Sequence, residues 1–249
     1  MVKISTSARS PLSPTLWPAD AFVWWQSLLF AFGLFVTTVV AAIAFGLAWA
    51  GVFGLASLKH PSTGFLLAVQ CASYVPALIL ALYVLPRLAH RSLRDLGLRA
   101  PTPAEVGWGI IGSAAMFLVS GAIGGFEEHV LHQKVQETAV DLLKTVHGPL
   151  AFLFAFIACI LAPIVEELVF RGFLFNALLR YSPVAIAAVL SALVFGIAHG
   201  SWSAFAPLAG AGLVLAVVYY RTGALSASMI AHAGFNAIAV VGFFFFKTA

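Results

Sequence analysis

Long apolar runs, separated by short polar stretches, restrict the fold of this chain more than any other feature of its sequence. A helix needs about 20 mostly apolar residues to cross a bilayer, and the bilayer core excludes unpaired backbone groups. With 62% hydrophobic and 9% charged residues, the chain has too little polar surface for a water-soluble protein. We therefore expect an all-α, polytopic transmembrane bundle of about seven to eight helices.

The apolar runs predict seven spans. Their approximate residues are 21–58, 64–85, 105–123, 150–179, 183–200, 205–220 and 224–246. Residues 1–20 hold three prolines and no apolar periodicity, so we expect a flexible N-terminal tail ahead of one intramembrane domain over 21–249. Residues 126–148 form a polar insertion whose apolar residues recur at three- and four-residue spacing, which predicts an amphipathic helix.

Basic residues gather on one side of the expected bundle. With a cytoplasmic N-terminus, eight of them fall inside: Lys3, Arg9, Arg87, Arg91, Arg94, Arg99, Arg180 and Arg221. Those outside are Lys59, Lys134, Lys144 and Lys247. This bias satisfies the positive-inside rule. The formal net charge of +4 therefore follows from topology, and we expect the lipid bilayer as a partner and no nucleic acid.

Three charges interrupt the apolar run at 150–179, namely Glu166, Glu167 and Arg171. A charge near the bilayer centre costs about 2.5 to 3.5 kcal/mol on insertion scales, so such residues indicate a functional site. Glu167 and Arg171 are four residues apart on a helix, so we expect an ion pair between them. Glu166 has no such local partner, which makes it the better candidate for proton transfer.

Two of the seven histidines, His199 and His232, lie at or within apolar helices, and Asn236 follows His232 by one helical turn. Each of these groups is costly in a membrane unless they meet. If they meet, Glu166 with one histidine can polarise a water for attack on a carbonyl. The second histidine and the asparagine amide can then donate hydrogen bonds to the oxyanion, a set sufficient for amide hydrolysis.

Other chemistries are less well supported by the sequence. It contains neither the Gly-x-Ser-x-Gly motif of serine hydrolases nor the His-Glu-x-x-His motif of zinc proteases. A zinc ion held by Glu166, His199 and His232 remains an alternative, since two histidines and one glutamate form a known catalytic ligand set. A second alternative is a non-catalytic immunity or scaffold protein, in which the polar cluster serves to hold helices together.

The polar residues of the spans form three motifs in chain order. They are Glu-Glu-x-x-x-Arg from Glu166 to Arg171, Phe-x-x-x-His from Phe195 to His199, and His-x-x-x-Asn from His232 to Asn236. Together they resemble the signature of the CAAX prenyl protease and bacteriocin-processing family of intramembrane proteases, whose best-known members are the type II CAAX prenyl endopeptidases. The motif-bearing core is expected within 150–246.

The resemblance implies a glutamate-type intramembrane endopeptidase that needs no cofactor and acts on a peptide or protein substrate, prenylated in the case of CAAX processing. It implies that Glu166 and His199 activate the water and that His232 and Asn236 hold the oxyanion. It gives Glu167, Arg171 and Phe195 supporting roles. Members are often labelled metalloproteases, which keeps zinc as the alternative cofactor. The expected location is a bacterial inner membrane.

Overall fold

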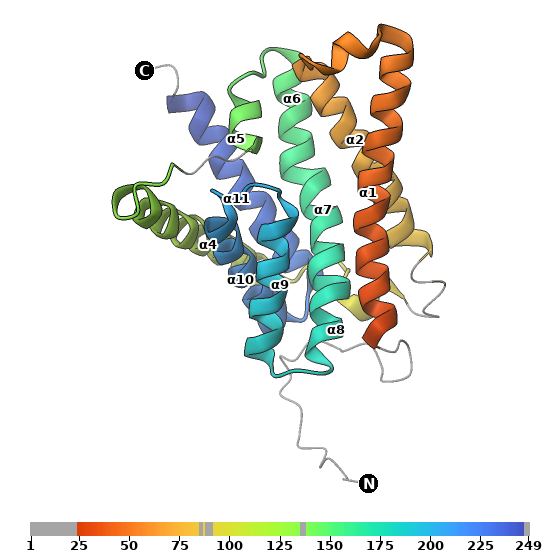
Figure 1. Cartoon of the computed structure of the whole chain (residues 1–249). Helices are drawn as coiled ribbons and strands as arrows, with labels where there is room; N and C mark the ends of the chain where they lie inside the picture. Colours follow the sequence, from red (N-terminus) through yellow and green to blue (C-terminus); the bar gives the residue numbers. More distant parts are fainter. Residues whose placement is uncertain (1–23, 85–86, 88–91, 135–137, 247–249) are drawn as a thin grey trace, which may run out of the picture.

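The structure is a computed structural model that describes residues 24–84, 87, 92–134 and 138–246 (Figure 1). The expected N-terminal tail at 1–20 lies outside the described residues. Within them the regular structure is entirely helical. Six helices are long and apolar enough to cross a membrane, and a seventh, Val184–Ala198, is apolar but shorter. The expected transmembrane helical bundle is confirmed, and the protein is an integral membrane protein.

Six of the longer helices are single elements. They are α1 (Trp24–Phe53), α2 (Thr63–Ile79), α4 (Pro103–His129), α9 (Val184–Ala198), α10 (Phe205–Thr222) and α11 (Leu225–Phe246). Short helical turns also occur between them: η1 (Leu55–Leu58), η2 (Leu80–Val84), η3 (Leu93–Leu96) and α5 (Thr138–Leu143).

One further helix runs over 149–179 and is here called the central helix. Its successive parts are α6 (Pro149–Phe156), η4 (Ile157–Leu161), α7 (Ala162–Glu167), η5 (Leu168–Phe175) and α8 (Asn176–Leu179). The segments η4 and η5 are π-helical. π-Helical turns are rare and frequently occur at functional sites. They flank α7, which carries Glu166 and Glu167.

The central helix lies between two groups of helices (Figure 1). On one side α1 and α2 pack against each other and against η5 and α7. On the other side α4 packs on α10 and α11, and α10 packs on α9. Since α11 contacts η4 and α7 while α9 contacts η5, the two groups meet along the central helix. Side chains from distant parts of the sequence are thereby brought to α7.

Small residues allow α4 and α11 to pack closely. A Cβ atom on Gly109 would lie 2.6 Å from Cγ2 of Ile230, and one on Gly112 would lie 2.8 Å from Cβ of Ala231. Ser113 Oγ, on the same stretch of α4, donates to the carbonyl of Ala231 at 3.0 Å. Small residues and interhelical hydrogen bonds drive helix association in membranes, where lipid tails remove the hydrophobic contribution.

The polar insertion at 126–148 differs from the single amphipathic helix that the sequence predicts. Helix α4 continues to His129, His132 has a φ of 56°, and α5 covers only Thr138–Leu143. Leu143 and Val146 are nonetheless buried, in a cluster with Phe154 of the central helix. The apolar spacing therefore marks residues that pack onto the bundle, while the left-handed backbone at His132 prevents one continuous helix.

The segment that joins α2 to α4 is tied to the turn between α10 and α11. Gly97 follows η3 with a φ of 77°, and its carbonyl accepts from the backbone N–H of Leu225 at 3.0 Å. The Tyr219 hydroxyl donates to the carbonyl of Leu96 at 3.1 Å and accepts from Asn176 at 2.7 Å. These buried contacts join three distant stretches of the chain.

We expect Gly97→Ala to destabilise the protein strongly. A Cβ at this position would lie 2.1 Å from the Gly223 carbonyl oxygen, and the left-handed backbone alone costs a non-glycine residue about 1–2 kcal/mol. The measurement is the thermal unfolding midpoint of the purified protein in detergent. Gly51→Ala is the matched control, since its Cβ position within α1 has no neighbour within 4 Å other than the backbone of its own helix and the adjacent residues. Equal midpoints for the two variants would contradict this account of the turn.

Candidate active site

Glu166 lies at the centre of a cluster of polar side chains from four helices. Its Oε1 atom accepts a hydrogen bond from the Tyr74 hydroxyl of α2 at 2.8 Å. Its Oε2 atom lies 3.8 Å from Nε2 of His199 and 3.8 Å from Nε2 of His232. The structure therefore brings together three of the four residues that the sequence predicts as catalytic, around one carboxylate oxygen.

His199 is placed by the end of a short helix. It is the C-cap of α9, which covers 15 residues and is therefore about 22 Å long, less than the hydrocarbon thickness of about 30 Å. Gly200 follows with a φ of 69°, a conformation that ends the helix. His199 Nδ1 lies 2.7 Å from the Phe195 carbonyl, which can only accept. Nδ1 therefore carries the proton, and Nε2 faces Glu166.

His232 is held by the buried ion pair of the central helix. Its Nδ1 atom lies 3.0 Å from Oε1 of Glu167, which also accepts from Nη1 of Arg171 at 3.1 Å. The predicted ion pair between Glu167 and Arg171 is thus confirmed, and both side chains are fully buried. Arg171 also donates to the Gly212 carbonyl of α10 at 2.7 Å. These contacts fix the orientation of the His232 ring.

The Phe195 ring packs against three polar side chains of the site. Its ring centroid is 4.6 Å from that of His199 and 5.8 Å from that of His232. The guanidinium carbon of Arg171 lies 4.7 Å from the same ring. An arginine over an aromatic face is stabilised by a cation–π interaction, and more so where water is excluded. Phe195 therefore packs against both histidines and the arginine at once.

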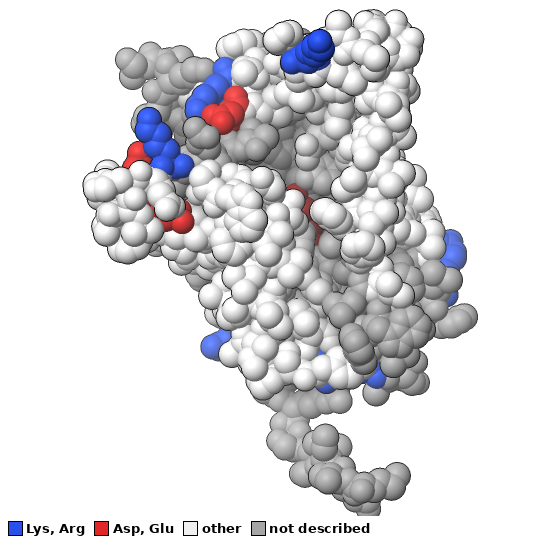
Figure 2. Space-filling view, viewed as in Figure 1, with Lys and Arg blue, Asp and Glu red and all other residues white. Residues whose placement is uncertain are grey.

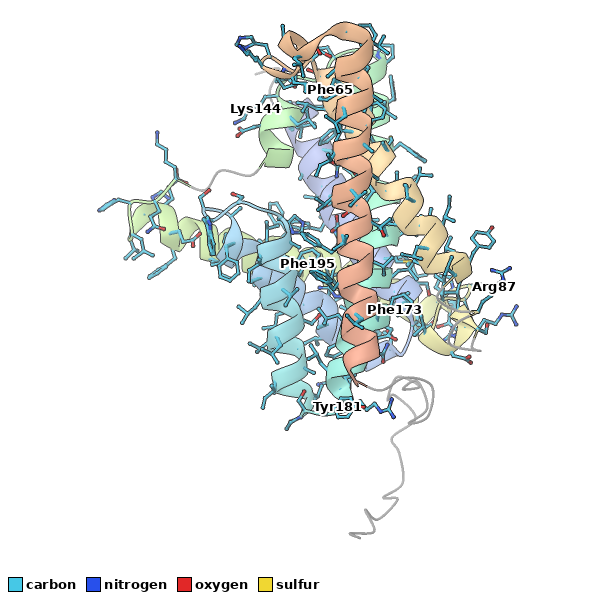
Figure 3. The ribbon with its side chains drawn as sticks, turned by 45° about the vertical axis from the view of Figure 1, so that its right-hand side comes forward. Phe65, Arg87, Lys144, Phe173, Tyr181 and Phe195 are labelled. Atoms are coloured by element: carbon cyan, nitrogen blue, oxygen red, sulfur yellow. The ribbon has the colours of Figure 1, made fainter. Side chains whose placement is uncertain are left out.

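The site lies near mid-height of the bundle. Figure 3 shows Phe195 midway between the end marked by Phe65 and Lys144 and the end marked by Tyr181. In Figure 2 the charged side chains lie toward the margins of the view, and acidic atoms show at the bottom of a hollow in the otherwise uncharged central face. Consistent with limited access, the Glu166 side chain keeps 15% of its surface exposed and that of His199 keeps 26%.

Three atoms face one another in the cluster: Oε2 of Glu166, Nε2 of His199 and Nε2 of His232. All three are hydrogen-bond acceptors when the imidazoles are neutral. Both Nδ1 atoms face groups that accept, so neutral His199 and His232 each present a lone pair at Nε2. Glu166 Oε2 is buried and has no hydrogen-bond partner within the described residues. A separation of 3.8 Å is also too long for a direct hydrogen bond. The arrangement is suited to receive a hydrogen-bond donor such as water.

Asn236 lies on the same helix as His232 but makes a different contact. Its Nδ2 atom donates to the carbonyl of Ala158 in η4 at 2.6 Å. Among the described contacts, none joins Asn236 to Glu166, His199 or His232. One N–H of its amide is therefore used by the backbone of the central helix, and the other remains for a different acceptor.

Tyr74 is a residue of the site that the sequence did not reveal. It lies in an apolar span in the first half of the chain and belongs to none of the three motifs. Its position beside Glu166 depends on the packing of α2 against α7. A hydroxyl within an apolar span is a weak signal, because tyrosine is common in transmembrane helices at interfaces.

Comparisons with known proteins point to a family of membrane proteases. A family model described as Type II CAAX prenyl endopeptidase Rce1-like matches residues 148–238, which include every motif residue but not Tyr74. Over 173 residues the chain is 25% identical to "Putative membrane peptidase YdiL" of Bacillus subtilis (strain 168), covering 68% of each chain. Over 179 residues it is 22% identical to "Membrane-embedded CAAX protease MroQ" of Staphylococcus aureus (strain USA300), covering 70% of this chain and 72% of that relative. No solved structure matches.

These findings confirm the resemblance that the motifs predict. Residues 148–238 match the Rce1-like family of type II CAAX prenyl endopeptidases, and both relatives carry names of membrane proteases. A match to a protease family implies a peptide or protein as the substrate.

The two adjacent carboxylates should differ sharply in their effect on stability. We expect Glu167→Gln to destabilise the protein by about 3–5 kcal/mol, because it leaves the buried Arg171 without a counter-charge. Glu166→Gln keeps an oxygen for Tyr74 and should change stability by less than about 1 kcal/mol. Thermal unfolding of both variants in detergent tests this. A Glu166→Gln variant as unstable as Glu167→Gln would contradict the assignment of the ion pair.

Proposed function

We propose that this protein is a glutamate-type intramembrane endopeptidase that hydrolyses a peptide bond near the membrane, with Glu166 and His199 activating the attacking water. The observation that carries the proposal is the position of Glu166. One carboxylate oxygen is fixed by Tyr74, and the other faces Nε2 of both histidines at 3.8 Å. The match to the Rce1-like family supports the reaction class.

In the proposed mechanism a water donates its protons toward Oε2 of Glu166 and Nε2 of His199. The water oxygen attacks the carbonyl carbon while one proton passes to Glu166, which later gives it to the leaving amine. The Phe195 carbonyl keeps His199 in the tautomer whose Nε2 accepts. The Tyr74 hydroxyl restricts rotation of the carboxylate, so Oε2 stays directed at the water.

His232 and Asn236 are proposed to stabilise the oxyanion. Because Nδ1 of His232 donates to Glu167, Nε2 can donate to an oxyanion only when the ring carries both protons. The free N–H of Asn236 is the second proposed donor.

The zinc-dependent alternative uses Glu166, His199 and His232 as ligands. Two features are typical of zinc-binding histidines: one Nδ1 faces a carboxylate and the other a backbone carbonyl. However, no group of three His, Cys, Asp or Glu side chains within the described ranges has the spacing to hold a metal ion. Zinc binding would therefore require these side chains to move. The proposed mechanism uses only Glu166, His199, His232 and Asn236.

The substrate proposed is a CAAX-type prenylated peptide, with a non-prenylated peptide as the second option. The family description and the printed name of the Staphylococcus aureus relative support this choice. The occurrence of both relatives in bacteria supports a bacterial inner membrane as the location. The distribution of basic residues supports a cytoplasmic N-terminus.

Cleavage of a farnesylated CAAX peptide by the purified protein in detergent tests the proposed function. Removing a general base typically costs about 100- to 10,000-fold in rate, so we expect losses in this range for Glu166→Gln and for His199→Ala. A strong zinc chelator should leave the wild-type rate unchanged. Activity that chelation abolishes and zinc restores would favour the metal-dependent alternative. A wild-type cleavage rate in folded Glu166→Gln would exclude Glu166 as the base and favour a non-catalytic role for the polar cluster.

Tyr74→Phe removes only the hydroxyl that holds Glu166. A hydrogen bond to a charged group is worth about 1.5–3 kcal/mol, so we expect kcat to fall about 10- to 100-fold with little change in KM. The same peptide assay measures both constants. Tyr83→Phe, in η2 near the end of the same helical segment and exposed, is the matched control and should behave as wild type. A purely structural role for Tyr74 would instead lower the unfolding midpoint without separating kcat from KM.

A further inference from the structure

The central helix lacks one backbone donor in the segment just before Glu166. In η4 the hydrogen bonds run five residues back, and the N–H of Ala162 donates to the carbonyl of Ile157. The next donor in this register, to the carbonyl of Ala158, would be residue 163. That residue is Pro163, which has no N–H. The Ala158 carbonyl is therefore left without its donor from the helix.

Asn236 supplies the hydrogen that Pro163 lacks. Its Nδ2 atom donates to the Ala158 carbonyl at 2.6 Å across the interface between α11 and η4. An unpaired backbone group inside a membrane costs several kcal/mol, so proline within a transmembrane helix is tolerated only where another group satisfies the freed carbonyl. The contact thus links a break in one helix to a side chain of another.

The same solution recurs along the central helix. In η5 the carbonyl of Phe170 accepts from Ser191 of α9 at 3.3 Å. The carbonyl of Arg171 accepts from Asn176 at 3.1 Å. In both π-helical segments, therefore, a polar side chain binds a carbonyl of the helix, and in η4 that side chain comes from the helix that carries His232.

We propose that Asn236 is a positioning residue, which compensates for Pro163 and thereby sets the position of α11, and with it His232, against the helix that carries Glu166. Helix α11 contacts the central helix through two polar side chains one turn apart, His232 at Glu167 and Asn236 at Ala158. These two contacts bracket the segment that includes Glu166. With both in place, α11 can neither slide nor rotate without breaking one of them.

This role is compatible with the proposed oxyanion contact and is separate from it. One N–H of the amide binds Ala158, and the second is the one proposed to face the oxyanion. The effect on activity rests on the proposed function, whereas the contact between Asn236 and Ala158 does not. The contact with Ala158 and its effect on activity can therefore be tested by different measurements on the same variants.

The test is a double-mutant cycle in the full-length protein with Asn236→Ala, Pro163→Ala and the combined variant. Pro163→Ala restores a backbone N–H to residue 163, so the Ala158 carbonyl no longer needs Asn236. Interhelical hydrogen bonds in membrane proteins correspond to a change of about 3- to 20-fold in the unfolding equilibrium. With Pro163 present, we expect Asn236→Ala to shift the unfolding equilibrium by at least about 3-fold. In the Pro163→Ala background, the same substitution should leave the equilibrium unchanged. The equilibrium is measured by SDS-induced unfolding in mixed micelles.

Ser113→Ala is the matched control. Ser113 also donates to a carbonyl across a helix interface with α11, that of Ala231, but this carbonyl does not depend on Pro163. Its cost should be the same in both backgrounds. If Pro163→Ala does not fold, Pro163→Ser restores the same N–H and takes its place in the cycle.

Peptide cleavage by the same variants tests positioning. A misplacement of about 1 Å can cost about 100-fold in rate, so Asn236→Ala should lose up to about 100-fold more activity with Pro163 present than in the Pro163→Ala background. The loss of the proposed oxyanion donor is common to both backgrounds and remains in each. An equal stability cost of Asn236→Ala in both backgrounds would overturn the proposal. So would a stability cost that disappears while the full rate loss remains, because Asn236 would then act on the reaction only directly. If no variant or wild type cleaves the peptide, the proposed function fails, and the stability cycle still decides the contact.

Discussion

The buried ion pair between Glu167 and Arg171 is the interaction on which the site depends. Neither charge is tolerable alone in the bilayer, and together they still require hydrogen bonds to their remaining polar atoms. Arg171 finds one at the Gly212 carbonyl of α10, and Glu167 finds one at His232 of α11. Satisfying one ion pair thus connects three helices and places a histidine beside Glu166.

The irregular geometry of the central helix serves the same end. Two π-helical segments flank α7, and the backbone groups that they leave exposed are bound by side chains from α9, α11 and the central helix itself. A regular helix would satisfy its own backbone and offer no such attachment points. The π-helical segments therefore provide polar contacts between helices in a region where lipid tails cannot form hydrogen bonds. These contacts lie next to Glu166, the candidate base.

Much of the architecture could be predicted from the sequence. Transmembrane helices must satisfy their backbone hydrogen bonds internally, so each span needs a long run of apolar residues, which is visible in the sequence. The spans, the all-helical fold and the ion pair between Glu167 and Arg171 follow from apolar length and from helical spacing. The extent of the helix at 126–148 did not follow, since the left-handed backbone at His132 leaves no clear mark in the apolar pattern. Tyr74 was missed because it lies 92 residues from Glu166 in the chain.

The sequence by itself determined that this is a membrane-embedded helical protein and that its spans contain polar residues in three motifs. Both follow from local properties, namely the hydropathy of each segment and the free-energy cost of placing a charged residue in the bilayer. Only the tertiary structure decided which of those residues meet. It joined Glu166 to Tyr74 and to both histidines, and it directed one amide N–H of Asn236 to the backbone at Ala158. Those pairings depend on how α2, α9 and α11 pack against the central helix, and these contacts join segments that lie far apart in the chain.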